Sequence, residues 1–189
     1  MTVMPAPPVF LDRDGTLIVE KHYLSDPDQV CIEDGVVEGL AMLIENGHPL
    51  FVLSNQSGIG RGMFAECDAR RVNEKVAHVL LEQGIEITAW YFCPHTPASR
   101  CDCRKPSPGM AIAASRDWNL ELAGSYVIGD KQADLELADA IDATGILVTT
   151  GHGRESADWA RDRARPVFDD LRGAAGYILR VDGEAIGTP

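Results

Sequence analysis

The chain has 189 residues, of which 45% are hydrophobic and 24% are charged, and we expect residues 1–189 to form a single domain. Its formal net charge of −12 argues against nucleic acid or anionic lipid as a partner, because like charges repel. The first residues lack a basic segment followed by an apolar one, and no apolar run approaches the ~18 residues of a membrane span. We therefore expect a cytoplasmic monomer with reduced cysteines and no membrane partner.

Short apolar runs alternate along the chain with longer segments of helical periodicity. We expect strands, in chain order, at Val9–Leu11, Leu50–Leu53, Ile87–Phe92, Tyr126–Ile128 and Ile146–Val148. We expect helices at Val36–Asn46, Ala65–Gln83, Pro108–Trp118, Lys131–Ala140 and Asp170–Leu179. Such alternation predicts an α/β fold with a mostly parallel sheet and helices on both faces. In these folds ligands bind beyond the carboxyl ends of the strands.

Two carboxylates follow the first expected strand, in the segment Leu11-Asp12-Arg-Asp14-Gly15. Side chains two residues apart on an extended segment point the same way, so these carboxylates repel unless a cation lies near them or one is protonated. Mg²⁺ prefers such hard oxygen ligands. One carboxylate can then attack phosphorus while the other gives and takes a proton. The alternative interpretation is an acidic turn in which the glycine supplies an unusual backbone angle.

Three further polar motifs follow other apolar runs. Ser54-Asn-Gln-Ser57 offers a hydroxyl and backbone N–H groups to phosphate oxygens. Arg104-Lys105 supplies two cations that can neutralise charge on a phosphoryl group during its transfer. Asp130-Lys-Gln-Ala-Asp134 adds carboxylates after a later strand, as a magnesium site requires. Each motif alone is a weak signal, but their order and placement together predict a phosphoryl-transfer site.

This combination resembles the haloacid dehalogenase (HAD) superfamily of aspartyl-phosphate phosphatases. The resemblance runs from about Val9 to Val148 and implies a Rossmann-like HAD fold. No long insertion separates the motifs, so we expect no separate cap domain. The residues that match the superfamily's four motifs are Asp12 with Asp14, Ser54, Lys105, and Asp130 with Asp134.

The resemblance assigns a role to each motif. It implies that Asp12 is the nucleophile and that Asp14 is first the general acid and then the general base. It implies that Ser54 and Lys105 hold the phosphoryl oxygens, with Arg104 beside them.

The resemblance also implies a catalytic Mg²⁺. Its ligands would be the Asp12 carboxylate, the Asp14 backbone carbonyl and the Asp130 carboxylate. We expect Asp134 to lie in the outer shell, where it would orient Lys131 or a water bound to the metal.

Three cysteines and a histidine lie close together: Cys93, His95, Cys101 and Cys103. Thiolates with an imidazole, in a reduced compartment, suit a closed tetrahedral Zn²⁺ site. Four protein ligands leave no open position, so we expect a structural ion that folds the loop carrying Arg104 and Lys105. The alternative is a chance cluster. Cys31 and Cys67 lie apart from it, and we expect them to be partly buried free thiols.

Within the superfamily, the zinc loop and the segment Cys101-Asp-Cys103-Arg-Lys-Pro106 resemble the branch of heptose 1,7-bisphosphate and histidinol-phosphate phosphatases. The segments Ser54–Phe64 and Lys105–Met110 resemble the heptose enzymes, whereas the short interval between His95 and Cys101 resembles the histidinol enzymes. The resemblance implies loss of the 7-phosphate from a heptose bisphosphate, whose product would feed lipopolysaccharide or another surface glycan. Histidinol phosphate or another sugar phosphate is the alternative.

The segment Glu20-Lys-His-Tyr23 falls where the resemblance places a sugar-contacting loop, although spacing alone fits an ordinary connection equally well. No partner is evident for His48, His78 or His152. The full set of expected substrate contacts is Glu20, Lys21, His22, Tyr23, Ser54, Asn55, Gln56, Ser57, Arg104, Lys105 and Lys131.

Two rival interpretations remain, the first from another class of protein and the second a different enzyme. One is a zinc-stapled interaction module whose carboxylates only bind metal, but such a module has no need of the proton donor Asp14. The other is a phosphatase acting on nucleic-acid ends, which the acidic charge disfavours.

Overall fold

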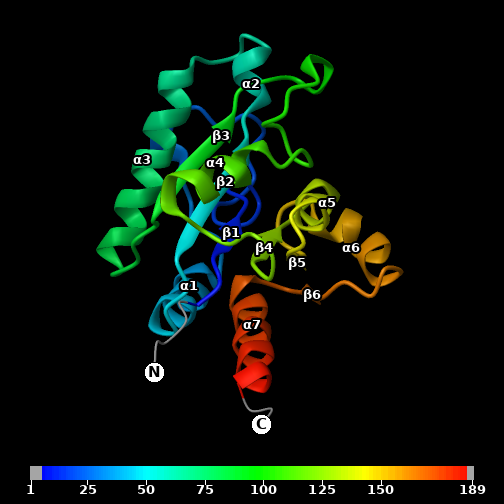
Figure 1. Ribbon diagram of the computed structural model, residues 1–189. Helices are drawn as coiled ribbons and strands as arrows, with labels where there is room; N and C mark the ends of the chain where they lie inside the picture. The colour runs from blue at the N-terminus through cyan, green and yellow to red at the C-terminus, as the bar shows by residue number, and fades with distance from the viewer. Residues whose placement is uncertain (1–5, 187–189) are drawn as a thin grey trace.

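The apolar runs of the sequence form six parallel strands that pair in one sheet (Figure 1). The computed structural model describes residues 6–186. The sheet order is β3-β2-β1-β4-β5-β6, so β1 lies in the interior beside β2 and β4, with Phe10 opposite both Phe51 and Val127. The strands are β1 (Val9–Leu11), β2 (Leu50–Asn55), β3 (Ala89–Cys93), β4 (Tyr126–Gly129), β5 (Thr144–Val148) and β6 (Val167–Phe168).

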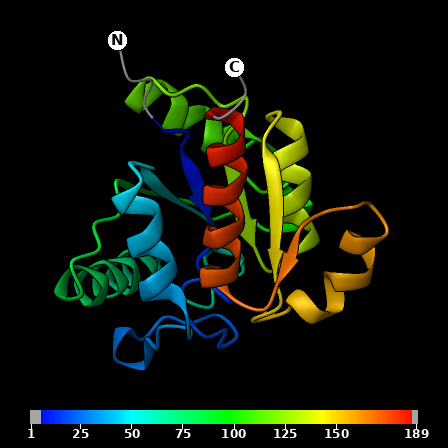
Figure 2. The same cartoon turned by 90° about the horizontal axis from the view of Figure 1, so that it is seen from below.

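Helices cover both faces of the sheet because the buried strand side chains alternate between two apolar layers. Val9 and Leu11 pack in the layer that contains residues of α1 (Val36–Glu45), α3 (Glu66–Glu82) and α7 (Leu171–Ile186). Figure 2 shows α1 and α7 side by side on this face, where they contact each other directly.

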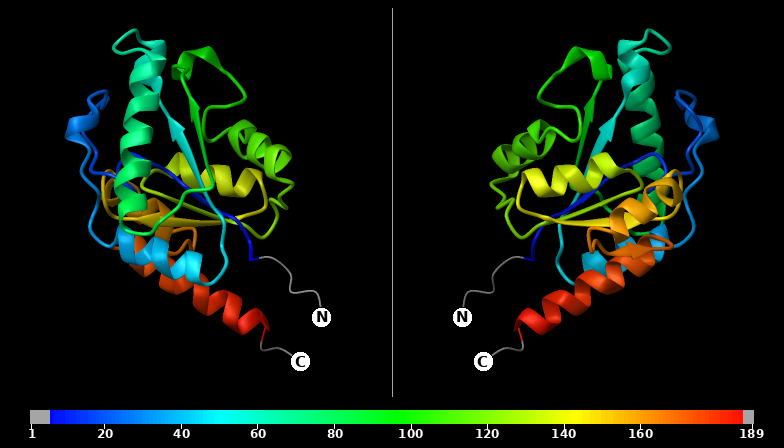
Figure 3. Two further views of the ribbon diagram at one scale, coloured as in Figure 1. Left: turned by 90° about the vertical axis from the view of Figure 1, so that its left-hand side faces the viewer. Right: turned by 90° about the vertical axis from the view of Figure 1, so that its right-hand side faces the viewer.

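The opposite layer contains Phe10, Phe51 and Leu53 with residues of α4 (Gly109–Trp118) and α5 (Gln132–Ala140). Figure 3 shows α3 and α4 on opposite sides of the sheet. The α6 helix (Gly153–Arg161) packs beside α5 and against β5. The predicted α/β architecture with a mostly parallel sheet is therefore confirmed.

The elements that the sequence pattern missed are short or polar. The α6 helix is mostly polar and buries only the small residues Gly153, Ala157 and Ala160, so few large apolar side chains mark it in the sequence. The β6 strand is a two-residue edge strand, too short to show a period. One turn of helix, α2 (Ser57–Gly60), and the 3₁₀ turns η1 (Pro27–Gln29) and η2 (Pro97–Ser99) complete the set.

The segment that joins β1 to α1 forms a small flap instead of a cap domain. Ile18 pairs with Ile32 in an antiparallel bridge, and the Val19 N–H donates to the Cys31 carbonyl at 2.9 Å. Within residues 6–186, the segment between Asp14 and Ser54 contains η1 and α1, and the segment between Ser54 and Lys105 contains α2, α3, β3 and η2, in line with the expected fold without a separate cap. Glu20 to Tyr23 lie within this flap, between the two bridged residues.

No helix within residues 6–186 has the length and apolarity of a membrane span.

Two histidines far from the strand ends do have partners, so the expectation of none is wrong for them. His48 is buried; its Nδ1 lies 2.8 Å from the Pro7 carbonyl and its Nε2 3.3 Å from Asp182 Oδ2 on α7. The Tyr126 hydroxyl donates to the other Asp182 oxygen. His78 is exposed and lies 3.4 Å from Glu82, one turn further along α3. The spacing of four residues indicates the His78–Glu82 pair, but no local spacing indicates the His48–Asp182 pair.

Candidate active site

The buried ammonium of Lys105 joins two acidic motifs. Its Nζ lies 2.8 Å from Asp12 Oδ1 and 2.7 Å from Asp134 Oδ1, and it donates to the Leu53 carbonyl at 2.5 Å. All three charged residues are buried, with at most 6% of each exposed. Parallel pairing of β1, β2 and β4 brings these residues together, since the three strands end at the same edge of the sheet.

The Asp14 carboxylate accepts hydrogen bonds from three side chains. Both of its oxygens take N–H groups of the Arg13 guanidinium, at 2.9 and 3.1 Å. Gln56 Nε2 donates to Asp14 Oδ2 at 2.8 Å, and the Ser54 hydroxyl lies 3.4 Å from the same oxygen. The second carboxylate of the first motif is therefore held away from the ion pair that engages Asp12.

Asp12, Asp130 and Asp134 form a cluster of three buried carboxylates whose oxygens lie within 4.8 Å of one another. Both oxygens of Asp134 are engaged, one by Lys105 and the other by the Lys131 backbone N–H at 3.0 Å. Both oxygens of Asp130 have partners as well, since Lys131 Nζ lies 3.3 Å from Oδ1 and the His152 backbone N–H donates to Oδ2. Hard carboxylate oxygens at this spacing fit a divalent cation such as Mg²⁺.

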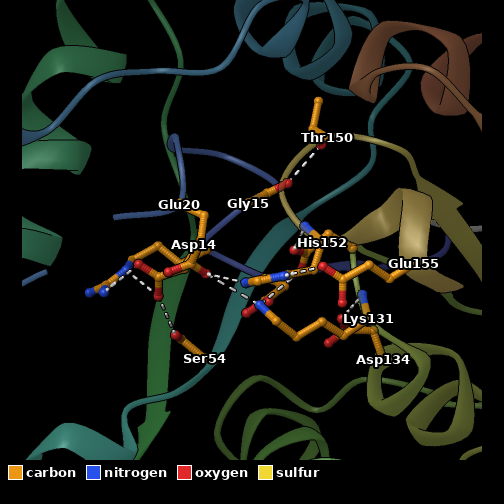
Figure 4. A network of polar contacts seen from close by, with 12 residues as sticks. Asp14, Gly15, Glu20, Ser54, Lys131, Asp134, Thr150, His152 and Glu155 are labelled. Carbon is orange, nitrogen blue, oxygen red and sulfur yellow. Dashed lines mark hydrogen bonds and ion pairs between the residues drawn. The ribbon is translucent and has the colours of Figure 1, made fainter. Parts of the chain in front are cut away.

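Close backbone packing holds this cluster in place. Gly15 has φ +83°, and a Cβ there would lie 2.3 Å from Asp130 Oδ2, so both its conformation and its contact require glycine. The Thr150 hydroxyl donates to the Gly15 carbonyl at 2.7 Å, and the His152 backbone N–H donates to Asp130 Oδ2 at 2.8 Å (Figure 4). The loop after β5 thus packs against the acidic turn after β1.

The charges of the cluster perturb one another. Burial alone would raise the pKa of Asp12, but the Lys105 ammonium, and then that of Lys131, hold this pKa below its usual value. Burial and the neighbouring Asp12 carboxylate raise the pKa of Asp130 to about 7. Burial also raises the pKa of Asp134, although Lys105 opposes this. Asp12 is therefore charged, whereas the Lys131 ammonium, 3.3 Å from Asp130 Oδ1, only partly offsets the increase in the pKa of Asp130.

These side chains open into a pocket of about 310 Å³. The expected residues that line it are Asp12, Asp14, Glu20, His22, Tyr23, Asn55, Gln56, Ser57, Arg104, Lys105, Lys131 and Asp134. Ser54 and Asp130 are buried beneath it, at 1% and 0% exposure. Lys21 does not line this pocket; its ammonium donates to the Gln29 carbonyl on the outer side of the loop, at 2.7 Å.

Asn55 lines the pocket, but its side chain already has a structural task. Its amide donates to the Lys105 carbonyl and accepts from the Lys105 N–H, both at 3.1 Å. This pair of bonds fixes the backbone that carries Lys105 to the end of β2. Gln56 is engaged too, since it donates to both Asp14 and Ser54 Oγ.

His152 is a pocket residue that the sequence reasoning missed. Its side chain lines the cavity with Glu20 and Lys131, and the Glu20 carboxylate lies 3.4 Å from Lys131 Nζ and 4.0 Å from His152 Nε2 (Figure 4). His152 Nδ1 lies 3.1 Å from Glu155. His152 follows the expected strand at residues 146–148, so the strand-end rule that identified Asp12 and Asp130 also points to it.

The four residues of the predicted zinc loop converge. The sulfur of Cys103 lies 3.0 Å from that of Cys93 and 3.5 Å from that of Cys101, and His95 Nδ1 lies 3.2 Å from Cys103. All four ligand atoms fall within 4.8 Å of one another, and this Cys₃His donor set fits a closed structural Zn²⁺ site.

The zinc loop leads directly into the catalytic pocket. Arg104 follows Cys103, donates to the His95 carbonyl at 3.2 Å and lines the pocket beside Lys105. The expectation that Cys31 and Cys67 are partly buried is wrong, since both are exposed. Cys31 lies on the flap, and Cys67 lies in the first turn of α3.

A parallel sheet with acidic residues at the ends of β1 and β4 and a lysine beside the first of them defines a phosphatase of the HAD class. A HAD-hydrolase-like family model matches residues 102–174. The structure is similar to that of a D,D-heptose 1,7-bisphosphate phosphatase from B. bronchiseptica, complexed with magnesium and phosphate, with a TM-score of 0.85 and 30% identity. That match covers 93% of this chain and 99% of the other.

Curated relatives narrow the class further. The D-glycero-β-D-manno-heptose-1,7-bisphosphate 7-phosphatase of Yersinia pestis is 39% identical over 166 residues, which cover 81% of this chain and 88% of that protein. The enzyme of the same name from Photorhabdus laumondii is 39% identical over 181 residues, which cover 92% of this chain and 89% of that protein. The chain belongs to the heptose-1,7-bisphosphate 7-phosphatase family of the HAD superfamily.

Proposed function

We propose that this chain hydrolyses the 7-phosphate of D-glycero-D-manno-heptose 1,7-bisphosphate in a Mg²⁺-dependent reaction. The observation that carries this proposal is a single pocket that presents Asp12 and Asp14 together with Arg104, Lys105 and Lys131. One cation can serve the phosphate that reacts and the others the phosphate that stays. The names of the relatives favour the heptose substrate, in its β form, over histidinol phosphate.

In the first step, a carboxylate oxygen of Asp12 attacks phosphorus and the bond from phosphorus to the sugar oxygen breaks. The electron pair stays on the sugar oxygen, which takes a proton from the Asp14 carboxyl group. Lys105 and Ser54 hold the phosphoryl oxygens, and Arg104 adds positive charge from the pocket wall. The products of this step are the sugar alcohol and an aspartyl-phosphate at Asp12.

In the second step, the Asp14 carboxylate takes a proton from a water molecule as the water oxygen attacks phosphorus. The bond from phosphorus to Asp12 breaks, so inorganic phosphate leaves and the Asp12 carboxylate is restored. Asp14 is then protonated again and ready for the next substrate. The two carboxylates therefore have different tasks, although they stand two residues apart.

Residues for the two metal ions are present in the same region. The Asp12 and Asp130 carboxylates and the Asp14 backbone carbonyl would hold Mg²⁺, which neutralises charge on the transferring phosphoryl group. Asp134, whose two oxygens contact Lys105 Nζ and the Lys131 backbone N–H, would lie in the outer shell. The Cys93–Cys103 cluster would hold the structural Zn²⁺.

We also infer a cytoplasmic enzyme that acts as a monomer of one domain. Asp12, Asp14, Arg104 and Lys105 line one pocket within a single chain, which supports a site that one subunit can form. A thiolate zinc site suits a reducing compartment.

The substrate assignment is tested by measuring kcat/KM for phosphate release, with Mg²⁺, from both anomers of the heptose bisphosphate and from histidinol phosphate. We expect the β-heptose bisphosphate to give the highest value and Asp12→Asn to abolish turnover on all three. A higher kcat/KM for histidinol phosphate would overturn the substrate assignment. Substantial activity of Asp12→Asn would overturn the nucleophile assignment.

A further inference from the structure

Arg13 is the largest of the fully buried side chains in the described part of the chain, and it carries a charge. It stands between Asp12 and Asp14, and the proposed reaction gives it no task. A buried charge costs stability unless it is fully paired, so its presence needs a physical reason. The contacts of its guanidinium supply one.

The guanidinium binds Asp14 and one residue of a distant helix. Nε and one terminal nitrogen donate to the two Asp14 oxygens at 3.1 and 2.9 Å, which is a bidentate contact. The other terminal nitrogen donates to Asn73 Oδ1 at 2.7 Å. Asn73 is buried on α3, a helix that otherwise contributes apolar residues to the core.

The Arg13 backbone supports the same turn. Its carbonyl accepts the N–H groups of Thr16, Leu17 and Ile18, at 3.3, 2.9 and 3.1 Å. The turn that carries Asp14 is thus closed on Arg13 from the backbone side, and the side chain fixes the carboxylate from the other. A carboxyl group held at both oxygens by a planar guanidinium cannot rotate freely.

The contacts also distinguish the two Asp14 oxygens. Oδ2 accepts from Arg13 and Gln56 and lies within reach of Ser54, so its acceptor positions are filled. Oδ1 accepts from Arg13 alone among the described residues, and it keeps a lone pair for a proton.

We propose that Arg13, anchored by Asn73, is a positioning residue that orients the Asp14 carboxyl group for proton transfer through Oδ1. Proton transfer in a transition state depends on the placement of the donor, so loss of this orientation slows the step that protonates the leaving oxygen. This inference rests on the proposed acid–base role of Asp14. It assigns catalytic importance to two residues that contact neither phosphate nor metal.

The test compares two leaving groups, because a poor alkoxide leaving group needs the proton from Asp14 and the phenolate of p-nitrophenyl phosphate hardly does. We expect Arg13→Lys to lower kcat/KM for the heptose bisphosphate by about 10- to 100-fold, within the ~10²–10⁴-fold that acid–base catalysis supplies. For p-nitrophenyl phosphate we expect a loss of roughly threefold or less. Asn73→Ala should also lower kcat/KM more for the heptose bisphosphate than for p-nitrophenyl phosphate, but by a smaller factor. It serves as the second variant if Arg13→Lys folds poorly.

A double-variant comparison separates positioning from a purely structural effect. If Arg13 acts through Asp14, Arg13→Lys causes no further loss in an Asp14→Asn background. Tyr126→Phe, at the other end of the sheet, is the matched control; it removes a buried hydrogen bond and should leave the ratio of the two substrates unchanged.

Equal losses on both substrates, or additive losses in the double variant, would overturn the proposal. If Asp14→Asn itself spared the alkyl phosphate, the acid–base role of Asp14 would fail instead. A loss with Asp14→Asn but none with Arg13→Lys or Asn73→Ala would overturn the positioning role alone.

Discussion

The Lys105 ammonium lies 2.8 Å from a carboxylate oxygen of Asp12, and both side chains are buried at the carboxyl end of the sheet. The same ammonium lies 2.7 Å from Asp134. One cation therefore balances two carboxylates, Asp12 after β1 and Asp134 on α5, and keeps Asp12 charged. In the proposed mechanism it is also the cation best placed to bind the oxygens of the phosphoryl group that is transferred to Asp12.

Replacing Lys105 by Met should lower both activity and stability. We expect kcat/KM to fall by about 10²–10³-fold, the loss typical of removing one electrostatic contact to the transition state. Stability should also fall, by up to about 3–5 kcal/mol, because Asp12 and Asp134 lose their buried cation. Steady-state kinetics and urea unfolding measure the two effects, with Lys75→Met on α3 as the control. Near-normal turnover in Lys105→Met would contradict the account.

Stabilisation by Mg²⁺ should depend on pH. The pKa of Asp130 is about 7 in the folded, metal-free protein and 3.8 in an ordinary setting, so the folded state binds more protons between these values. Stability of the metal-free protein should therefore fall as pH rises from about 4 to 7. The burial that raises the pKa of Asp134 acts in the same direction.

Bound Mg²⁺ removes this penalty, and protons compete with the metal at low pH. We expect Mg²⁺ to raise the thermal midpoint by several degrees at about pH 8 and by much less at about pH 5.5. Differential scanning fluorimetry with and without Mg²⁺ measures this, and Asp130→Asn should abolish most of the increase. An equal increase at both pH values would show that Asp130 does not control metal binding.

Loss of zinc should impair catalysis through the loop that carries Arg104 and Lys105. Cys103→Ser removes one of the four clustered ligand atoms, and we expect it to abolish stoichiometric zinc and to lower kcat/KM by about tenfold or more. The exposed Cys67 lies outside the cluster, so Cys67→Ser is the matched control and should keep both its zinc and its kcat/KM. Metal analysis by mass spectrometry gives the zinc content. Wild-type protein without zinc, purified in the absence of chelators, would exclude the zinc site.

Local apolar patterns were sufficient to predict the sheet and the order of its motifs. Val9–Leu11 and Ile146–Val148 are buried runs whose ends place Asp12 and His152 at one edge. The last third of the fold was only partly predicted because α6 has few apolar residues and β6 is two residues long. Strand order could not be read from periodicity, because pairing depends on contacts between distant segments.

The parts of the site that sequence reasoning missed are the supporting contacts. Arg13 and Asn73 are 60 positions apart, and no local spacing indicates that they meet. Local sequence also does not indicate the shape of the loop at His22 and Tyr23. Both residues have positive φ, of 29° and 58°, although neither is glycine. Lys21 donates to the Gln29 carbonyl and does not line the pocket, whereas Glu20, His22 and Tyr23 do.

The most direct test of the central claim is to follow the reaction of D-glycero-β-D-manno-heptose 1,7-bisphosphate by ³¹P NMR in the presence of Mg²⁺. The account predicts that the 7-phosphate signal is replaced by inorganic phosphate while the 1-phosphate signal persists. Loss of the 1-phosphate first, or no release of phosphate by the metal-loaded wild-type protein, would contradict it.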